Sequence, residues 1–321
     1  MKAIKPNDIE SAASDQSYHV PVLLNETIEA LNIKPDGVYV DCTFGGGGHS
    51  RAILNGLGPQ GKLFVFDQDE DAFANCPNDD RLHFIQQNFK YIKKFLRVNQ
   101  VVKVDGILAD LGVSSHQFDE ADRGFSIRFD APLDMRMNVK QAVTAADVLA
   151  SYSEHQLHKM FEKYGEVTNA KTLARLIVEK RGLTPLTTIA RFKEAVQPIV
   201  KGNPNKYFAQ IFQALRIEVN DELGALRELL EQSIQLLNPE GRIAVITFHS
   251  IEDRIVKHFF KCNVHEDEQK DGIFGTTAPK ILLPVNKKPI SAGADELKKN
   301  PRSRSAKLRV AEKSKEHSTN E

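Results

Sequence analysis

Short apolar runs alternate with helical patterns through the first third of the chain. Four of these runs predict strands, at 37–44, 61–69, 81–88 and 103–112. The segments between them predict helices, at 49–57, 70–76 and 89–98. Strands separated by single helices of this length are typical of βαβ units around a parallel sheet. Right-handed crossovers would then place helices on both faces of a doubly wound sheet.

The alternation of predicted strands and helices ends after residue 112. A long loop rich in turn residues comes first, and helical patterns without strands follow at 144–163, 167–181, 187–198 and 206–219. Their apolar residues recur at spacings of three and four, as in Leu173, Leu176 and Ile177, which is typical of amphipathic helices.

Strand patterns resume near the carboxyl terminus. A strand is predicted at 241–248, a helix at 251–262 and two closing edge strands at 279–284 and 306–313. The simplest organisation is an α/β domain formed by 1–134 and 216–321, with an all-helical insertion at 135–215. Such an insertion would lie beside the carboxyl ends of the strands, where open sheets bind ligands.

The composition describes a soluble globular protein, with 41% apolar and 27% charged residues. No apolar run approaches the roughly 20 residues that a membrane span needs. The polar first 19 residues lack the apolar core of a secretory signal and predict a loose leader. Cys42, Cys76 and Cys262 are far apart and odd in number, which argues against a disulfide framework or a metal cluster and fits a reducing cytoplasm.

A formal net charge of zero conceals two basic segments. Residues 135–215 hold 12 Lys and Arg against 6 Asp and Glu, and residues 279–315 hold 11 against 3. Basic segments on an acidic body indicate a polyanionic partner that is bound in specific places. For the first segment, a solvated lysine-rich surface is an equally good interpretation.

The sequence VDCTFGGGGHS at 40–50 indicates a ligand that touches backbone, because an ordinary turn needs one or two glycines rather than four. No Lys follows the glycines, which excludes a phosphate-binding P-loop. The match to the dinucleotide fingerprint is imperfect. Asp41 ahead of the glycines would repel a pyrophosphate, whereas the ammonium and sulfonium groups of S-adenosylmethionine would favour a nearby acid.

Further acids end the later strands. Asp67 lies 19 residues after the last glycine, where an acid commonly hydrogen-bonds ribose hydroxyls, and Asp69 fits a helix cap. Phe89 could flank an adenine or pack in the core. Asp110 ends the fourth strand, and no cysteine lies in its loop. This argues against methylation of a ring carbon, which needs a cysteine nucleophile, so an exocyclic amine, an oxygen or a carboxylate remains as the acceptor.

Six stretches together resemble the RsmH (MraW) family of bacterial methyltransferases. They are HVPVLLNETIEALNIKPDGVYVDCTFGGGGHS, DGILADLGVSSHQFDEADRGFS, PLDMRMN, FQALRIEVNDEL, FHSIEDRIVKHF and NPRSRSAKLRVAEK, in order from residue 19 to 313. The resemblance implies methyl transfer from S-adenosylmethionine to N4 of a cytidine in the decoding region of 16S ribosomal RNA. It also implies a Rossmann-like class I methyltransferase domain with a helical insertion that contacts RNA.

The resemblance also implies which residues contact the cofactor. Carried over by motif, they are Gly47, Gly48, His49, Asp67, Phe89, Asp110 and Gln117. Asp110 is in addition a candidate catalytic acceptor for an N–H of the target amine. Gly46 and His116 stand where a larger side chain and a proline are common in the family, which alters local flexibility but none of these contacts.

Other shared residues have two interpretations. Ser250 and Asp253 fit a capping box at the helix after the fifth strand. Candidate RNA contacts are His249, Arg254, Arg302 and Arg304. Arg216, Asn220 and Glu222 fit either a hydrogen-bond network at the hinge of the insertion or a catalytic role. Phe118, Phe125 and Phe129 fit either stacking on an unpaired base or core packing.

Three rival functions remain open from the sequence. They are a methyltransferase for protein or small molecules, a ribosome assembly factor that only holds the cofactor, and a nicotinamide oxidoreductase. The chain gives no indication of its oligomeric state.

Overall fold

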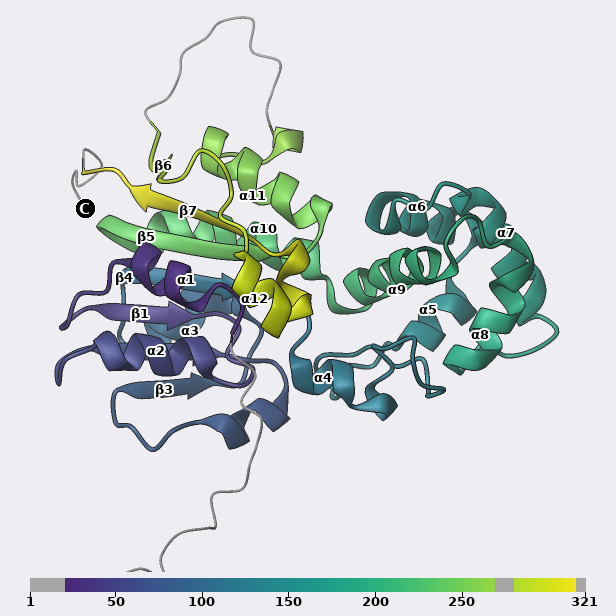
Figure 1. Ribbon diagram of the computed structural model, residues 1–321, viewed down its shortest axis with the longest axis horizontal. Coiled ribbons are helices and arrows are strands. Elements are labelled where there is room, and N and C mark those ends of the chain that lie inside the picture. The colour runs from purple at the N-terminus through teal and green to yellow at the C-terminus, as the bar shows by residue number, and fades with distance from the viewer. Residues whose placement is uncertain (1–20, 269–279, 316–321) are drawn as a thin grey trace, which may run out of the picture.

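A computed structural model describes residues 21–268 and 280–315, so the predicted leader lies outside the described residues. Its centre is a seven-stranded sheet with the order β3-β2-β1-β4-β5-β7-β6 (Figure 1). The strands are β1 (Val38–Asp41), β2 (Lys62–Phe66), β3 (Leu82–Ile85), β4 (Val104–Asp110), β5 (Leu237–Thr247), β6 (Leu282–Pro284) and β7 (Lys307–Lys313). β1 to β5 are parallel, which confirms the predicted α/β class.

One of the two predicted closing edge strands is not an edge. β7 pairs antiparallel with both β5 and β6, so only β6 closes the sheet. Four consecutive residues of β7, from Leu308 to Ala311, are buried, as expected of an interior strand that is covered on both faces.

Helices cover both faces of the sheet, as the crossover rule predicts. One face packs against α1 (Leu24–Leu31) and α2 (Gly48–Gly56). The other face packs against α3 (Ile92–Val98), α10 (Glu222–Leu236) and α11 (Ser250–Cys262). The sequence analysis missed α1 and α10, although Leu223, Leu226 and Leu230 of α10 recur at helical spacing and are buried.

The helical region has a hydrophobic core of its own, formed by residues between Phe125 and Val219. Its helices are α5 (Ala145–Ser151), α6 (Glu154–Gly165), α7 (Ala170–Arg181), α8 (Ile189–Val196) and α9 (Pro204–Asn220). In Figure 1 these helices form a lobe beside the sheet. The separate core supports the predicted insertion, while its boundaries at 135 and 215 stay a prediction because α9 runs across the second one.

The single helix predicted at 144–163 is two helices. Ser153 caps α6, where its hydroxyl accepts a hydrogen bond from the Gln156 N–H, and Tyr152 between the two helices has extended backbone. A serine side chain that binds nearby backbone competes with helix continuation, and this local chemistry overrode the apolar periodicity.

Short helices complete the chain. They are α4 (Ser115–Asp119), α12 (Ala294–Lys299) and the 3₁₀ turns η1 (Glu70–Asn75), η2 (Phe89–Tyr91), η3 (Ala121–Arg123), η4 (Gln197–Ile199), η5 (Glu266–Glu268) and η6 (Pro301–Ser305). In the part of the chain that the structure describes, no helix is both long enough and apolar enough to span a bilayer.

The capping box of α11 lies one residue before the predicted one. His249 is the N-cap and pairs with Glu252, so the prediction that Ser250 caps with Asp253 is wrong. Asp253 instead accepts a hydrogen bond from Arg309 Nε at 2.7 Å and pairs with Lys307 at 3.1 Å. The side chains of Asp253 and Arg309 are 13% and 8% exposed, so this pair fastens α11 to β7.

Removing Asp253 should therefore destabilise the sheet. We expect Asp253→Ala to lower the free energy of unfolding by about 3 kcal/mol, because it leaves Arg309 buried without its counter-ion. The measurement is denaturant unfolding at neutral pH. Asp267→Ala is the matched control, because its pair with Arg227 is at the surface and its loss should leave the free energy of unfolding nearly unchanged. Equal losses for the two variants would contradict this account.

Candidate active site

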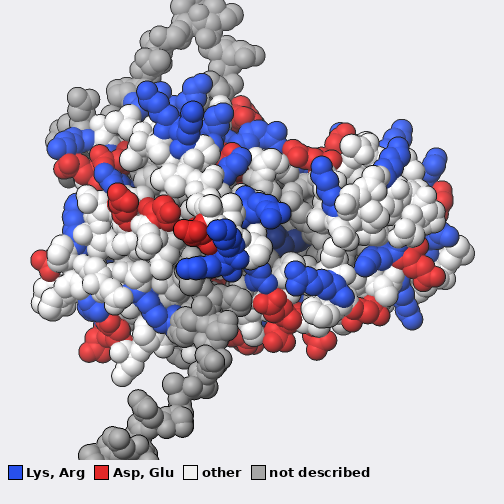
Figure 2. Space-filling model, viewed as in Figure 1, with Lys and Arg blue, Asp and Glu red and all other residues white. Residues whose placement is uncertain are grey.

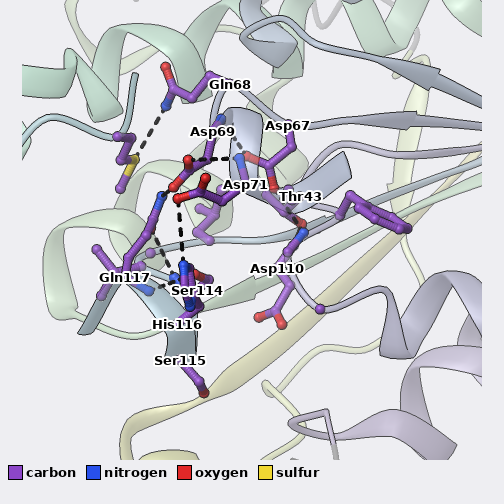
Figure 3. A pocket seen from close by; sticks show the side chains of 18 of the residues that line it. Thr43, Asp67, Gln68, Asp69, Asp71, Asp110, Ser114, Ser115, His116 and Gln117 are labelled. Atoms are coloured by element: carbon purple, nitrogen blue, oxygen red, sulfur yellow. Dashed lines mark hydrogen bonds and ion pairs between the residues drawn. The ribbon is translucent and has the colours of Figure 1, made fainter. Parts of the chain in front are cut away.

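A large cavity lies at the carboxyl ends of the parallel strands, as expected for an open α/β sheet (Figure 3). Its volume is about 1260 Å³. The loops after β1, β2, β3 and β4 line it together with η1, α4 and residues of α10 and η6. Segments as far apart in sequence as Pro21 and Arg302 therefore meet at one place.

The glycine loop shapes one wall of this cavity. Gly45 and Gly47 have positive φ angles of 50° and 73°, a conformation that side chains disfavour. A Cβ on Gly48 would lie 2.2 Å from Cγ of Pro21, so that glycine permits the close approach of the segment before α1. Gly48 and His49 line the cavity, whereas Gly47 forms the turn without lining it. A direct ligand contact for Gly47 stays a prediction.

Asp41 does not face the cavity, which corrects its expected position beside the ligand. Its side chain is 1% exposed. One carboxylate oxygen accepts the Thr43 N–H at 3.0 Å and the other accepts the Ser50 hydroxyl at 2.6 Å. Asp41 therefore connects the end of β1 to α2 by hydrogen bonds. It influences the cavity through its charge, which contributes to the raised pKa of Asp110.

Asp67 lines the cavity at the end of β2 and holds two neighbouring loops. Its carboxylate accepts the N–H of Gly45 at 2.8 Å and that of Asp69 at 2.9 Å. Burial raises its pKa to about 6, with smaller contributions from the charges of Asp69 and Asp41, although the two backbone hydrogen bonds oppose the shift. Each oxygen still has a lone pair for a ligand hydroxyl, because a carboxylate offers about four acceptor sites.

Asp110 lines the cavity at the end of β4 and has a buried acceptor without a partner. Its backbone N–H donates to Thr43 Oγ1 at 2.7 Å, while Oδ1 of its side chain has no hydrogen-bond partner among the described residues. Burial raises the pKa of Asp110 well above its usual value, and the charges of Asp41 and Glu252 add to this effect. A buried polar atom that is left unpaired in a cavity marks a place for a ligand.

His49 is the neighbour of Asp110. Its Nε2 lies 3.1 Å from the Val22 carbonyl oxygen, which can only accept, so Nε2 carries a hydrogen. Its Nδ1 then faces Asp110 Oδ2 at 3.6 Å. Burial lowers the pKa of His49 as it raises that of Asp110, so both shifts favour an uncharged pair in the absence of a ligand.

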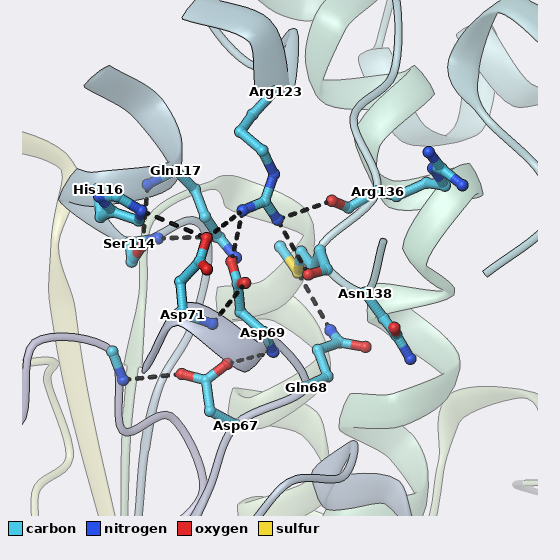
Figure 4. Close-up of polar contacts among 12 residues, drawn as sticks. Asp67, Gln68, Asp69, Asp71, Ser114, His116, Gln117, Arg123, Arg136 and Asn138 are labelled. Atoms are coloured by element: carbon cyan, nitrogen blue, oxygen red, sulfur yellow. Dashed lines mark hydrogen bonds and ion pairs between the residues drawn. The ribbon is translucent and has the colours of Figure 1, made fainter. Parts of the chain in front are cut away.

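Gln117 and Asp69 belong to a polar network that the sequence showed only in part (Figure 4). Gln117 completes the capping box of α4 with Ser114, and its amide donates to Asp69 at 2.7 Å. Asp69 caps η1, as predicted, and pairs with Arg123 at 2.9 Å. Arg123 also donates to the carbonyl oxygens of Arg136 and Met137, each at 3.1 Å.

This network joins the loop after β2 to the chain that enters the helical region. Asn220 at the end of α9 completes the joint, because its side chain accepts from the Met137 N–H and donates to the Met135 carbonyl oxygen, both at 2.8 Å. Arg216 forms a two-pronged pair with Glu222 at 2.8 and 3.0 Å. Of the two interpretations left open for Arg216, Asn220 and Glu222, the structure bears out the hinge network. No sequence motif pointed to Arg123.

Phe89 is half-buried, lines the cavity and also packs against the core of the sheet. Core packing of this aromatic residue is therefore confirmed, and its contact with an adenine stays a prediction that its place in the cavity lining allows. Asn88 before it caps η2 through the Lys90 N–H and donates to Gln68 at 3.2 Å, which fixes the loop after β3.

The candidate RNA contacts have different surroundings. His249 is 9% exposed and is committed to the cap of α11. Arg254 pairs with Glu166 of the helical region at 3.3 Å. Arg302 lines the cavity and pairs with Asp119 at 2.8 Å, and Arg304 is exposed.

The three aromatic candidates differ in how deeply their side chains are buried. Phe125 is 6% exposed and belongs to the helical core, whereas Phe129 is 45% exposed. Phe118 is partly buried and lies between two guanidinium groups, with Arg128 at 5.6 Å and Arg302 at 5.1 Å from the ring centroid.

The cavity is strongly acidic. The carboxylates that line it are those of Asp67, Asp69, Glu70, Asp71, Asp110, Asp119, Glu120, Asp122, Glu222 and Glu252. Against these ten acids, the arginines that line it are Arg123 and Arg302. Such a field favours a cationic ligand and opposes one that carries phosphates, which agrees with S-adenosylmethionine and disagrees with a dinucleotide.

Comparison with known proteins decides the family, because residues 16–314 match the MraW methylase family. The chain belongs to the MraW methylase family. Two similar proteins are each named ribosomal RNA small subunit methyltransferase H. The one from Parabacteroides distasonis is 50% identical over 301 residues, which cover 93% of this chain and 98% of that protein. The one from Flavobacterium johnsoniae is 52% identical over 303 residues, which cover 92% and 98%.

Membership in the MraW methylase family confirms the expected methyltransferase class and the expected cofactor, S-adenosylmethionine. A nicotinamide oxidoreductase is excluded by the same finding. The residues present fit the cofactor, because Asp110 offers an unpartnered acceptor and the surrounding acids offer a negative field for its sulfonium and ammonium charges.

The raised pKa of Asp67 should make cofactor affinity depend on pH. If the carboxylate accepts the ribose hydroxyls, affinity for S-adenosylhomocysteine should be about tenfold lower at pH 5 than at pH 7.5, because pH 5 lies about one unit below the pKa of about 6. Calorimetric titration measures this. S-adenosylhomocysteine is used because its sulfur is uncharged, so no sulfonium charge contributes to the measured pH dependence.

Asp67→Asn is the control for this dependence. The variant should bind more weakly at pH 7.5 and should lose most of the change between pH 5 and 7.5. An unaltered pH dependence in the variant would assign the titration to another group and contradict the role of Asp67.

Proposed function

We propose that this methyltransferase transfers a methyl group from S-adenosylmethionine to N4 of a cytidine in the decoding region of the 16S rRNA of the small ribosomal subunit. The observation that carries the proposal is the unpartnered Oδ1 of Asp110 in the acidic cavity. This acceptor complements an amine N–H, whereas it would repel an oxyanion or a phosphate. The names of the similar proteins support small-subunit rRNA as the substrate class.

We assign cofactor binding to Gly47, Gly48, His49, Asp67, Phe89, Asp110 and Gln117. Their positions support this set, because all except Gly47 line the cavity. Asp67 would accept ribose hydroxyls, and Phe89 would pack against the adenine. Gln117 would act chiefly by holding Asp69 and the start of α4, since both ends of its amide are engaged there.

Only a nucleobase can enter this cavity at a low electrostatic cost. RNA carries a negative charge at every nucleotide, and ten carboxylates line the cavity. The target cytidine would therefore leave its stack and insert its neutral base, while its backbone phosphates stay outside. Flipping also exposes N4, which is inaccessible in a paired helix.

The chemical step needs an amine lone pair that is directed at the methyl group. When bound, the cofactor supplies a methyl group on a cationic sulfur, and the neutral thioether is a good leaving group. Asp110 would hold one N–H of the cytosine amine and turn the nitrogen lone pair away from the ring. Methylation would leave a proton on N4 to be lost and the cofactor as a neutral thioether. The positive charge of the bound cofactor would favour the ionised form of Asp110, and this carboxylate would then accept the proton. His49 then shares that proton through Oδ2, 3.6 Å away.

The basic rim of the cavity would contact the phosphates. Arg128 and Arg302 flank the ring of Phe118, and Arg304 is exposed on the same turn as Arg302. Figure 2 shows Lys and Arg side chains gathered over α12 and in the hollow beside the helical lobe. We assign RNA contact to Arg302, Arg304 and the helical insertion, and a positioning role to His249 and Arg254, whose side chains are engaged at α11.

The substrate is tested by nucleoside analysis of 16S rRNA. Cells that lack the gene should lose one N4-methylated cytidine from the decoding region, and the purified protein should restore it to their small subunits. A full complement of N4-methylcytidine in the deletion strain would contradict the proposal and favour a protein or small-molecule acceptor.

The catalytic role of Asp110 is tested separately. Asp110→Asn should slow single-turnover transfer at saturating cofactor by about 100-fold or more, because it removes the proton acceptor but keeps the size of the side chain. Asp122→Asn is the control, since Asp122 lines the same cavity but is exposed. Unchanged transfer in Asp110→Asn would limit this residue to cofactor binding.

A further inference from the structure

A second basic surface lies outside the active site, along η2 and α3. Lys90, Lys93, Lys94 and Arg97 stand at positions i, i+3, i+4 and i+7, which fall on one face of a helix. Lys93, Lys94 and Arg97 are exposed. We call these four residues the α3 basic face.

This face borders a groove of about 580 Å³ between α3 and α10. Beside the four basic residues, the groove is lined by Tyr91, Val98, Gln232 and a single acid, Glu228. Tyr91 is 44% exposed and Val98 is 71% exposed, so a partner can reach both side chains. The groove therefore combines four cations with an aromatic ring, which is the composition of a backbone-tracking nucleic-acid surface.

The positive charges of this face are largely uncompensated. Lys90 lies 3.5 Å from Asp221, but within residues 21–268 and 280–315 no ion pair involves Lys93, Lys94 or Arg97. Lys93 contacts the neutral side chain of Gln235, and Lys94 lies 5.8 Å from the ring centroid of Phe95. Like charges at these spacings slightly destabilise a helix, so helix stability does not explain them.

The face starts at the mouth of the active-site cavity. Phe89, the first residue of η2, lines that cavity, and α3 follows directly after η2. An RNA strand whose base occupies the acidic cavity has its phosphates repelled there and needs cations nearby. The α3 basic face offers them beside α10, where Lys90 pairs with Asp221 just before that helix begins.

We propose that the α3 basic face binds the phosphodiester backbone of the small-subunit rRNA next to the target cytidine, with Tyr91 available to stack on an unpaired base. This inference rests on the proposed function and extends it, because it specifies where the RNA lies. An acidic protein partner would use the same charges, and the experiment below separates the two.

The test is the triple variant Lys93→Gln, Lys94→Gln, Arg97→Gln. Lys90 is retained because of its ion pair with Asp221. The substrate is small ribosomal subunits from cells that lack the gene. We expect KM for the subunits to rise about tenfold at 0.15 M salt, and the slope of log affinity against log salt to become shallower by about 2 to 3, because about three phosphate contacts are lost. The affinity for S-adenosylmethionine and kcat at saturating subunits should stay unchanged.

The matched control is the triple variant Lys34→Gln, Lys62→Gln, Lys280→Gln. These lysines lie at or just before the starts of β1, β2 and β6, at the opposite edge of the sheet from the cavity, so KM and the salt slope should stay as in the unaltered protein. Both variants should keep the unfolding temperature of the unaltered protein within a few degrees.

The outcomes separate this inference from the proposed function. If the unaltered protein transfers no methyl group to the subunits, the proposed function fails. If it does so and the α3 variant has the KM and salt slope of the control, the inference is overturned. It is also overturned if KM rises without a change in the salt slope, since RNA phosphates are then not the partner of this face.

Discussion

The accumulation of negative charge at one edge of the sheet is the constraint on which the rest of the structure depends. Asp41, Asp67, Asp110 and Glu252 all lie at the carboxyl ends of strands or just after them. The fold stabilises three of these acids with hydrogen bonds from backbone N–H groups, from Ser50 or from the cap of α11. The carboxylate of Asp110 receives no such hydrogen bond from the described residues, and burial together with the charges of Asp41 and Glu252 raises its pKa well above the usual value. A cationic cofactor favours the ionised form of Asp110, which couples ligand binding to the charge state of the site.

The same edge is also the joint between the two parts of the molecule. Asp69 holds Gln117 of α4 and Arg123 of η3, and Arg123 holds the backbone at Arg136 and Met137. The loop after β2 is therefore connected through one guanidinium group to the entrance of the helical region. This contact links the loop that we assign to cofactor binding with the helices that we assign to RNA.

The sequence predicts the parts of this protein that local patterns determine. Period-two and period-3.6 apolar patterns located the parallel strands and most helices, and strand ends located Asp67 and Asp110. Such patterns do not predict contacts between residues that are far apart in the sequence. Nothing near Asp253 in the chain reveals that Arg309 is its partner, and Arg123 carries no motif. Asp41 was misplaced because the direction of a side chain at a strand end depends on Thr43 and Ser50, which the alternation pattern does not encode.

The acidic cavity and the basic surfaces follow from a single physical requirement. A cationic cofactor needs negative charge around it, while the polyanionic substrate that we propose needs positive charge, and both must meet at the atom that accepts the methyl group. The fold meets both needs by separating them in space: acids dominate the lining of the cavity, which also holds Arg302, and the α3 basic face lies outside it. The neutral base is the only part of an RNA chain that can cross from one field to the other. For the transfer to N4 that we propose, base flipping would follow from the electrostatics of the site as well as from the inaccessibility of N4 in a helix.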